Sequence, residues 1–163
     1  MVVHSSKGRI GLLIAVTGVF AITGSLAAAD EQTVSGIFKG NGQEAKLACV
    51  SAAKGEPLAD KPTIVLVFSE KDHTKDKKAQ VGAMFGKYGS ALIIKVYENG
   101  QIVGCQVCHE NHKKSGFNSI GDIKMSDFKL ADGKIQGKLS TGGEAEAFGE
   151  KWEVDIKFQA KAP

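Results

Sequence analysis

The strongest chemical signal in this chain is a run of sulfur and imidazole side chains between residues 105 and 112. Cys105, Cys108, His109 and His112 lie within this short segment, and the whole chain has only three cysteines and four histidines. Thiolates and imidazoles are the protein ligands that zinc and copper prefer. Neighbouring cysteines can also form disulfides. The segment is therefore the first candidate for a functional site.

The spacing Cys105-x-x-Cys108-His109 resembles the haem-attachment motif of cytochromes c, in which two thioether bonds hold the porphyrin and the adjacent histidine ligates the iron. The resemblance covers five residues. It implies a covalently attached haem c, an exported protein and a role as an electron carrier, with Cys105, Cys108 and His109 as the cofactor-binding residues. The motif follows a predicted strand, whereas in cytochromes c it begins a helix.

Two other interpretations use the same segment. In one, Cys105, Cys108, His109 and His112 are ligands of a zinc or copper ion. In the other, no cofactor is bound, and the thiols of Cys49, Cys105 and Cys108 are buried or form one disulfide, which would stabilise an exported domain by about 2–4 kcal/mol. We favour a non-catalytic binding or structural module with an unknown small ligand or protein partner, and its functional edge is the 105–112 loop.

Composition and motifs argue against several functional classes. The only arginine is Arg9, so lysine carries the positive charge of the rest of the chain. Because the planar arginine fork is the usual group for recognising phosphate and guanine, we expect no nucleic-acid binding. The histidines of His109-Glu110-Asn111-His112 are three positions apart, whereas a zincin needs four, and no Gly-x-Ser-x-Gly elbow occurs.

The N-terminus has the pattern of a secretory signal. Lys7 and Arg9 precede a weakly polar to apolar stretch over residues 10–26, and Ala27 and Ala29 occupy the two small-residue positions of a cleavage site. We expect residues 1–29 to be removed and residues 30–163 to form a single β-rich domain that is periplasmic or secreted and does not span a membrane. A membrane anchor is the competing interpretation of residues 10–26, because that stretch approaches the about 20 residues that span a bilayer.

The remaining chain alternates between apolar and polar residues and is interrupted by turn dipeptides, which predicts an antiparallel β-sandwich or small barrel of about eight strands with one short helix. Asn41-Gly42, Asn99-Gly100 and Asp132-Gly133 predict three hairpins, which join residues 33–39 to 44–52, 91–97 to 101–107 and 123–130 to 134–139. Residues 63–68 and 152–158 predict two further strands. We expect a bulge near Ser126 and Asp127 and loops at 53–62, 109–121 and 141–151.

The single helix is predicted from the helical spacing of Val81, Met84, Phe85 and Tyr88, with Gly89 as its C-terminal cap.

Strand geometry also bears on the candidate site. Cys105 is in phase with Val107 and should face the core, whereas a strand continued to Cys108 would direct that thiol to the opposite face. The two sulfurs can share a partner only if the strand ends near Cys105. Cys49 is in phase with Leu47 on a predicted strand, so we expect its thiol to face the core.

Overall fold

The computed structural model describes residues 1–2 and 32–163. Almost all of the predicted export signal, residues 3–29, lies outside the described residues. Within them, no helix is both long enough and apolar enough to cross a bilayer.

The described chain forms two antiparallel sheets, which we call sheet A and sheet B. The strand order of sheet A is β2-β1-β11-β9-β8, with β10 paired to β11, and the order of sheet B is β3-β4-β5-β6-β7. The strands of sheet A are β1 (Thr33–Gly40), β2 (Gln43–Glu44), β8 (Lys124–Ala131), β9 (Lys134–Ser140), β10 (Ala145–Ala147) and β11 (Glu150–Lys161). The strands of sheet B are β3 (Cys49–Leu58), β4 (Lys61–Ser69), β5 (Ala91–Tyr97), β6 (Ile102–Cys108) and β7 (Phe117–Asn118), and the helix α1 spans Ala79–Met84.

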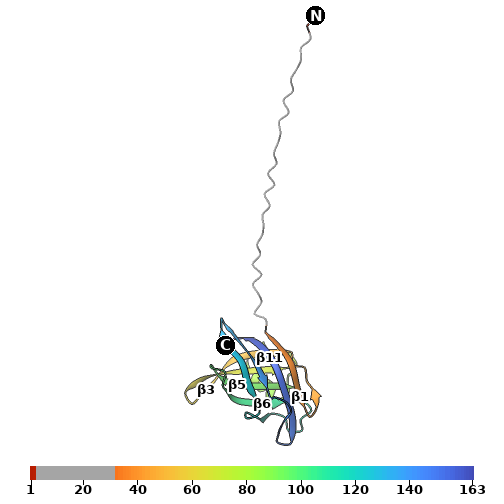
Figure 1. Cartoon of the computed structure of the whole chain (residues 1–163), viewed down its shortest axis with the longest axis vertical. Helices are drawn as coiled ribbons and strands as arrows, with labels where there is room; N and C mark the ends of the chain where they lie inside the picture. Colours follow the sequence, from red (N-terminus) through yellow and green to blue (C-terminus); the bar gives the residue numbers. More distant parts are fainter. Residues whose placement is uncertain (3–31) are drawn as a thin grey trace.

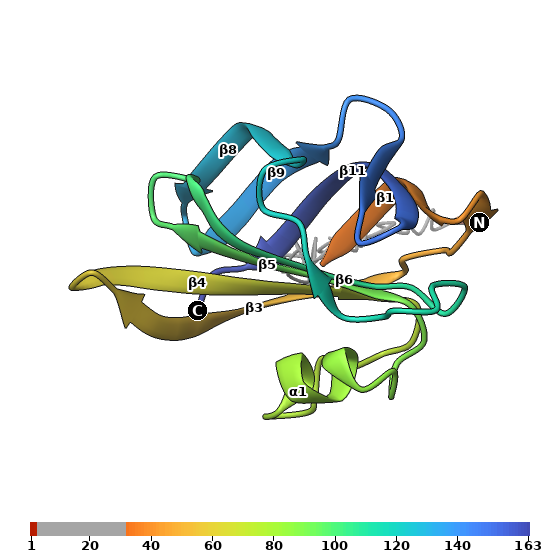
Figure 2. The same cartoon turned by 90° about the horizontal axis from the view of Figure 1, so that it is seen from below.

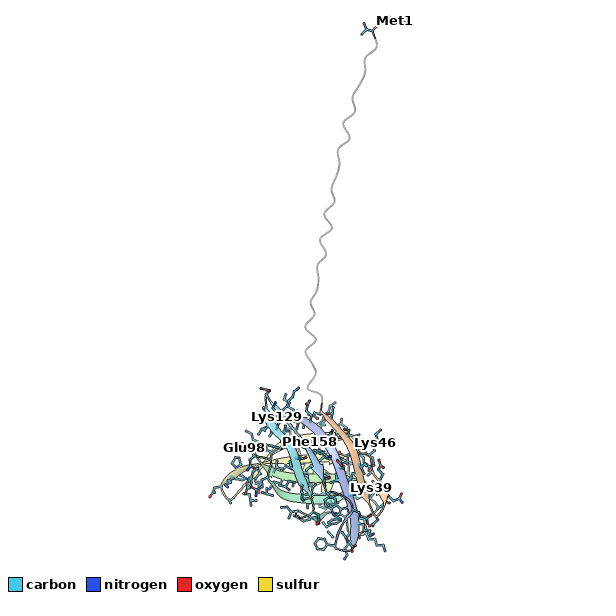
Figure 3. The ribbon with its side chains drawn as sticks, in the orientation of Figure 1. Met1, Lys39, Lys46, Glu98, Lys129 and Phe158 are labelled. Carbon is cyan, nitrogen blue, oxygen red and sulfur yellow. The ribbon has the colours of Figure 1, made fainter. Side chains whose placement is uncertain are left out.

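The two sheets pack face to face as a sandwich, and their strands cross steeply (Figures 1 and 2). Alternate residues of each strand face the partner sheet, so the core contains Phe38 and Trp152 from sheet A and Leu66, Phe68 and Leu92 from sheet B. Phe158 lies near the middle of the molecule in Figure 3, and Lys39, Lys46, Lys129 and Glu98 lie nearer its margins. The predicted sandwich is confirmed.

Sheet B is also buried on its outer face. Val65, Val67 and Ile93 point away from sheet A and pack with Ala83 of α1 and with Tyr88. Figure 2 shows α1 against this outer face. The segment 70–90 therefore works as a cover, and every residue of β4 from Thr63 to Ser69 is buried.

Short-range turn signals predicted two of the three expected hairpins correctly. The β5–β6 and β8–β9 hairpins form with the expected strands, and the register of β8 and β9 shifts between Ser126 and Lys129 as the predicted bulge requires. Asp127 has a φ of 52°, which places the bulge at the expected residue.

Three other predictions need correction. Asn41-Gly42 joins β1 only to the two-residue β2, because the chain leaves sheet A after Glu44 and β3 belongs to sheet B, while β1 pairs along its whole length with β11 on its other side. Residues 53–62 are not a loop, since β3 and β4 form a hairpin whose turn residues Ala59 and Asp60 have positive φ angles, as a type I′ turn requires. The predicted loops at 109–121 and 141–151 contain the short strands β7 and β10.

The helix is shorter than predicted and buries a different face. It ends at Met84 with Phe85 as its C-cap, well before Gly89. Val81, Met84 and Phe85 are exposed, whereas Ala83 is buried. A small alanine faces the sheet because α1 lies close to the apolar surface of β4 and β5.

The core packing predicts a contrast between two leucines. Replacing Leu66 with alanine should lower the free energy of unfolding by about 2–5 kcal/mol, because its fully buried side chain would leave a cavity. Replacing Leu130, whose exposure is 37 %, should cost about 1 kcal/mol or less. Urea unfolding of both variants measures the difference, and equal losses would contradict this account of the core.

Candidate functional site

The structure separates the two cysteines of the Cys-x-x-Cys segment. Cys105 points between the sheets and packs in the main core beside Val107, whereas Cys108 joins Val67 and Ala91 in the outer cluster of sheet B. The separation follows from strand geometry, because β6 continues to Cys108 and residues three apart on a strand face opposite sides. The two thiols therefore do not form a shared site.

Cys49 does not face the core as predicted. Residues 45–48 carry the chain from sheet A to sheet B and are not in a strand, so the phase restarts at β3 and Val50 takes the buried position. Cys49 is half-buried on the outer side, opposite Ser69 in register. All three cysteines are free thiols in this structure.

Burial makes the two thiols of the predicted site poor nucleophiles. Removal from water raises the pKa of Cys105 to about 12 and that of Cys108 to about 11. Because the thiolate is the form that attacks and ligates, both side chains are protonated and weakly reactive at neutral pH.

The two histidines of the segment do come together. Their ring centroids are 5.2 Å apart, and both rings are buried, with exposures of 1 % for His109 and 7 % for His112. Gly40 at the end of β1 makes room for them, because a Cβ atom at that position would lie 2.4 Å from Cγ of His109 and 2.7 Å from Nε2 of His112. Trp152 pairs with Gly40 across the β1–β11 ladder.

The hydrogen bonds of the two rings indicate where their protons lie. His112 Nε2 is 2.9 Å from the carbonyl oxygen of Lys151, which can only accept, so Nε2 carries the proton and Nδ1 has a free lone pair. His109 Nδ1 accepts the backbone N–H of Asn111 at 3.2 Å, so its proton is on Nε2. Neutral His109 and His112 therefore offer one donor and one acceptor.

These two ring nitrogens lack partners. Among the side chains of the described residues, His109 Nε2, His112 Nδ1 and Trp152 Nε1 are buried without a hydrogen bond. A buried polar atom without a partner costs about 1–3 kcal/mol, and such atoms in a native structure mark places that bind water, an ion or a ligand. All three belong to residues grouped around Gly40.

Burial also keeps His109 uncharged. Desolvation lowers the pKa of His109, and the neighbouring His112 lowers it further, while the Glu70 carboxylate and a contact of the ring with the backbone of Gln43 act in the opposite direction. At neutral pH the ring is therefore the neutral tautomer that presents Nε2–H as a hydrogen-bond donor.

The loop that carries the histidines is fastened to sheet A by two polar side chains. Asn41 donates through Nδ2 to the Asn111 carbonyl oxygen at 2.9 Å and to Glu150 Oε2 at 2.7 Å. Glu150 Oε1 accepts the backbone N–H of Lys114 at 2.9 Å. The hydrogen bond from Asn41 and the backbone N–H groups of the loop lower the pKa of Glu150.

A pocket of about 310 Å³ borders the two histidines, and we call it the histidine pocket. Its lining residues come from the end of α1, the following turn and the 108–115 loop; they are Met84, Phe85, Gly86, Gly89, Cys108, His109, Glu110, His112 and Ser115. Phe85 is 81 % exposed at the pocket. The pocket thus has an apolar margin and a polar wall.

Sequence reasoning found His109 and His112 but missed the residues that position them. Asn41-Gly42 predicts only a turn, although Gly40 makes room for the two rings and Asn41 fastens the loop. Glu150 lies far away in sequence and gave no signal. These contacts depend on the pairing of β1 with β11, which no local pattern predicts.

The predicted ligand set is only partly assembled. Within residues 1–2 and 32–163, no group of three or more His, Cys, Asp and Glu side chains lies in an arrangement that could hold a metal ion.

Comparisons with known protein families, with curated proteins and with solved structures find no match to this chain. The functional argument therefore depends on the geometry of the histidine pocket.

The close approach of Gly40 to the histidines predicts a strong effect of a single methyl group. Gly40→Ala should destabilise the protein by about 1–3 kcal/mol, because the new Cβ overlaps both rings. Gly121→Ala is the matched control, since a Cβ there meets no atom within 4 Å. Chemical unfolding measures both changes, and a Gly40→Ala variant as stable as the wild type would contradict the packing described.

The lowered pKa of Glu150 predicts how the stability of the protein depends on pH. Its pKa is lowered on folding, so its stabilising contribution is present above the unfolded value of about 4.3 and is lost as the pH falls through the folded pKa. The stability difference between the wild type and Glu150→Gln should therefore be largest near pH 7 and shrink below about pH 4.3. Urea unfolding between pH 3 and 7 tests this expectation, with exposed Glu146→Gln as the control. A difference that is independent of pH would refute it.

Proposed function

We propose that the protein is an exported binding module that takes a small, neutral, polar ligand in the histidine pocket. The observation that carries the proposal is the pair of buried imidazoles whose unpartnered nitrogens are a donor, His109 Nε2–H, and an acceptor, His112 Nδ1. A primary or secondary amide has the complementary pair, a carbonyl oxygen and an N–H group. Such a ligand would accept a hydrogen bond from His109 Nε2 and donate one to His112 Nδ1.

The surroundings support a neutral ligand. Burial disfavours charge on His109, and Glu110 is the one carboxylate among the lining residues, none of which is a lysine, so an anionic ligand finds no cation there. Met84 and Phe85 offer exposed apolar surface at the margin, where the carbon atoms of a ligand would pack. Recognition therefore combines an apolar contact outside with two directional hydrogen bonds inside.

A metal ion is the second candidate, because Cys108, His109 and His112 border the same pocket as the thioether of Met84. Zinc or copper would need a lone pair from each ligand. His112 Nδ1 offers one in the neutral tautomer, whereas the Cys108 thiol and His109 Nε2 would each have to release a proton on binding. The neutral polar ligand is therefore the better fit. Covalent haem stays a prediction from the Cys-x-x-Cys-His motif.

The proposal is tested by titrating the full chain with acetamide, Zn²⁺ or Cu⁺ while the imidazole nitrogens are followed by nitrogen-15 NMR. Acetamide should shift both side chains saturably. His112→Gln can keep a donor for the Lys151 carbonyl but lacks the Nδ1 acceptor, and His109→Asn can keep an acceptor for Asn111 but lacks the Nε2 donor. Each should weaken acetamide binding by about tenfold, the value of one hydrogen bond of about 1.4 kcal/mol.

Lys113→Ala is the control, because Lys113 is exposed on the same loop and does not line the pocket. Saturable binding of Zn²⁺ or Cu⁺ with displacement of the Nε2 proton of His109 would favour the metal site. A red product that is heavier by one haem, made in a host competent in haem attachment, would favour the cytochrome-like function. Acetamide shifts that are identical in all variants would rule out the proposed pocket.

A further inference from the structure

A third buried histidine lies outside the histidine pocket. His73 is 2 % exposed in the cover of sheet B, and its ring contacts two serine hydroxyls of the sheet. Nε2 is 2.8 Å from Oγ of Ser51, and Nδ1 is 2.5 Å from Oγ of Ser69. Both serines face outward, on the neighbouring strands β3 and β4.

The contact of Ser69 with the Lys71 carbonyl oxygen indicates which nitrogen of His73 carries the proton. Ser69 Oγ donates its only proton to the carbonyl oxygen of Lys71 at 2.7 Å. It can therefore only accept from His73, so the proton of the neutral ring is on Nδ1. Nε2 then has a lone pair and accepts the hydroxyl proton of Ser51. A serine hydroxyl that donates to an oriented neutral imidazole is the arrangement that activates a nucleophile.

The position of Ser51 makes it accessible. It is half-exposed on β3, which is the edge strand of sheet B. His73, the partner of Ser51, borders an open hollow of about 770 Å³ whose lining does not include Ser51 itself; Tyr88 and two aspartates, Asp72 and Asp76, also line it. Four lysines surround the same hollow; they are Lys75, Lys77, Lys78 and Lys87. Of these four, Lys87 forms an ion pair with Asp76, with Nζ 2.7 Å from Oδ2.

We propose that Ser51 is a nucleophile activated by His73, with Ser69 as a positioning residue, and that it cleaves carboxylic esters that carry a negative charge. The lysines outnumber the carboxylates around the hollow, so a negatively charged ester is attracted there. This site shares no residue with the histidine pocket and does not depend on the function proposed above.

The reaction balances with water as the only co-reactant. Ser51 Oγ attacks the carbonyl carbon while its proton passes to His73 Nε2. The ester C–O bond breaks, and the alcohol leaves with that proton, which gives an acyl-Ser51. Water then attacks the acyl carbon and transfers a proton to His73 Nε2, and this proton returns to Ser51 Oγ as the carboxylic acid departs.

The charges that face His73 suit a base that becomes an imidazolium during the reaction. Burial lowers the pKa of His73, which favours the neutral ring at neutral pH, while hydrogen bonds with the backbone of Lys71 and Val67 and the carboxylates of Asp72 and Asp76 oppose this shift. Tyr88 from the cover lies with its ring centroid 5.6 Å away. Cys49 on β3 is uncharged at neutral pH, since burial raises its thiol pKa.

A fluorophosphonate probe tests the nucleophile, because attack by Ser51 forms a P–O bond, releases fluoride and leaves a stable adduct. Peptide mass spectrometry of the labelled folded chain should place the adduct on Ser51. Ser51→Ala should abolish labelling, His73→Gln should slow it by about 100-fold or more, and Ser69→Ala should slow it less. Hydrolysis of a carboxylate-bearing 4-nitrophenyl ester should exceed that of the acetate ester and show the same dependence on the variants.

Ser126→Ala is the matched control, since Ser126 is an exposed strand serine on β8. The labelling rate of the wild type should rise with pH and reach half its maximum below about pH 6.5, the ordinary value for histidine, and Ser69→Ala should move that midpoint. If His73→Gln does not fold, the pH dependence of the wild-type labelling rate shows whether a histidine activates Ser51. Labelling of Ser51 that is no faster than that of Ser126, or a rate that rises only in alkali, would overturn the proposal.

Discussion

Sheet B has an apolar outer face as well as an apolar inner one, and the need to cover that outer face organises the molecule. Burial of apolar surface is the dominant favourable term in folding, so a strand such as β4 that is apolar on both sides requires packing on both sides. Sheet A covers the inner side. On the outer side, α1 and the turn that leads to Tyr88 cover it. The segment 70–90 is short and has few apolar side chains, so polar contacts complete its attachment.

Those polar contacts place both candidate sites at the margins of the cover. On the β3 side, His73 is fixed between Ser51 and Ser69, and Tyr88 donates to Asp76. On the β6 side, the turn after α1 meets the 108–115 loop, and the histidine pocket lies between them. Buried polar groups are retained where they are hydrogen-bonded or where they have a partner to bind. Both ring nitrogens of His73 have hydrogen-bond partners, and we propose that it acts as a base. His109 and His112 each have one nitrogen without a partner, and we propose that they bind a ligand.

Local sequence was sufficient for features that a few neighbouring residues decide. Asn99-Gly100 and Asp132-Gly133 tolerate positive φ angles, so their hairpins could be predicted, and alternation along 152–158 predicted the buried side of β11. The buried face of the helix could not be predicted in this way, because Met84 and Phe85 follow helical spacing and yet are exposed. Their environment is set by sheet B, which is distant in sequence. The same limit explains Cys49, whose phase changes where the chain crosses between the sheets.

The sequence by itself determined the β class and the two hairpins at Asn99-Gly100 and Asp132-Gly133, because the two-residue period of a strand and the turn dipeptides are local properties of the chain. Whether Cys105 and Cys108 point in opposite directions depended on where β6 ends, which the structure decided. The sequence also directed attention to His109 and His112. Only the tertiary structure decided which ring nitrogens lack partners, that Gly40 receives the two rings, and that Ser51, Ser69 and His73 meet. These contacts join strands and loops that are far apart in the chain, and they exist only because β1 pairs with β11 and β3 with β4. Their energies come from burial and from hydrogen-bond geometry, which a linear pattern of residue types does not contain.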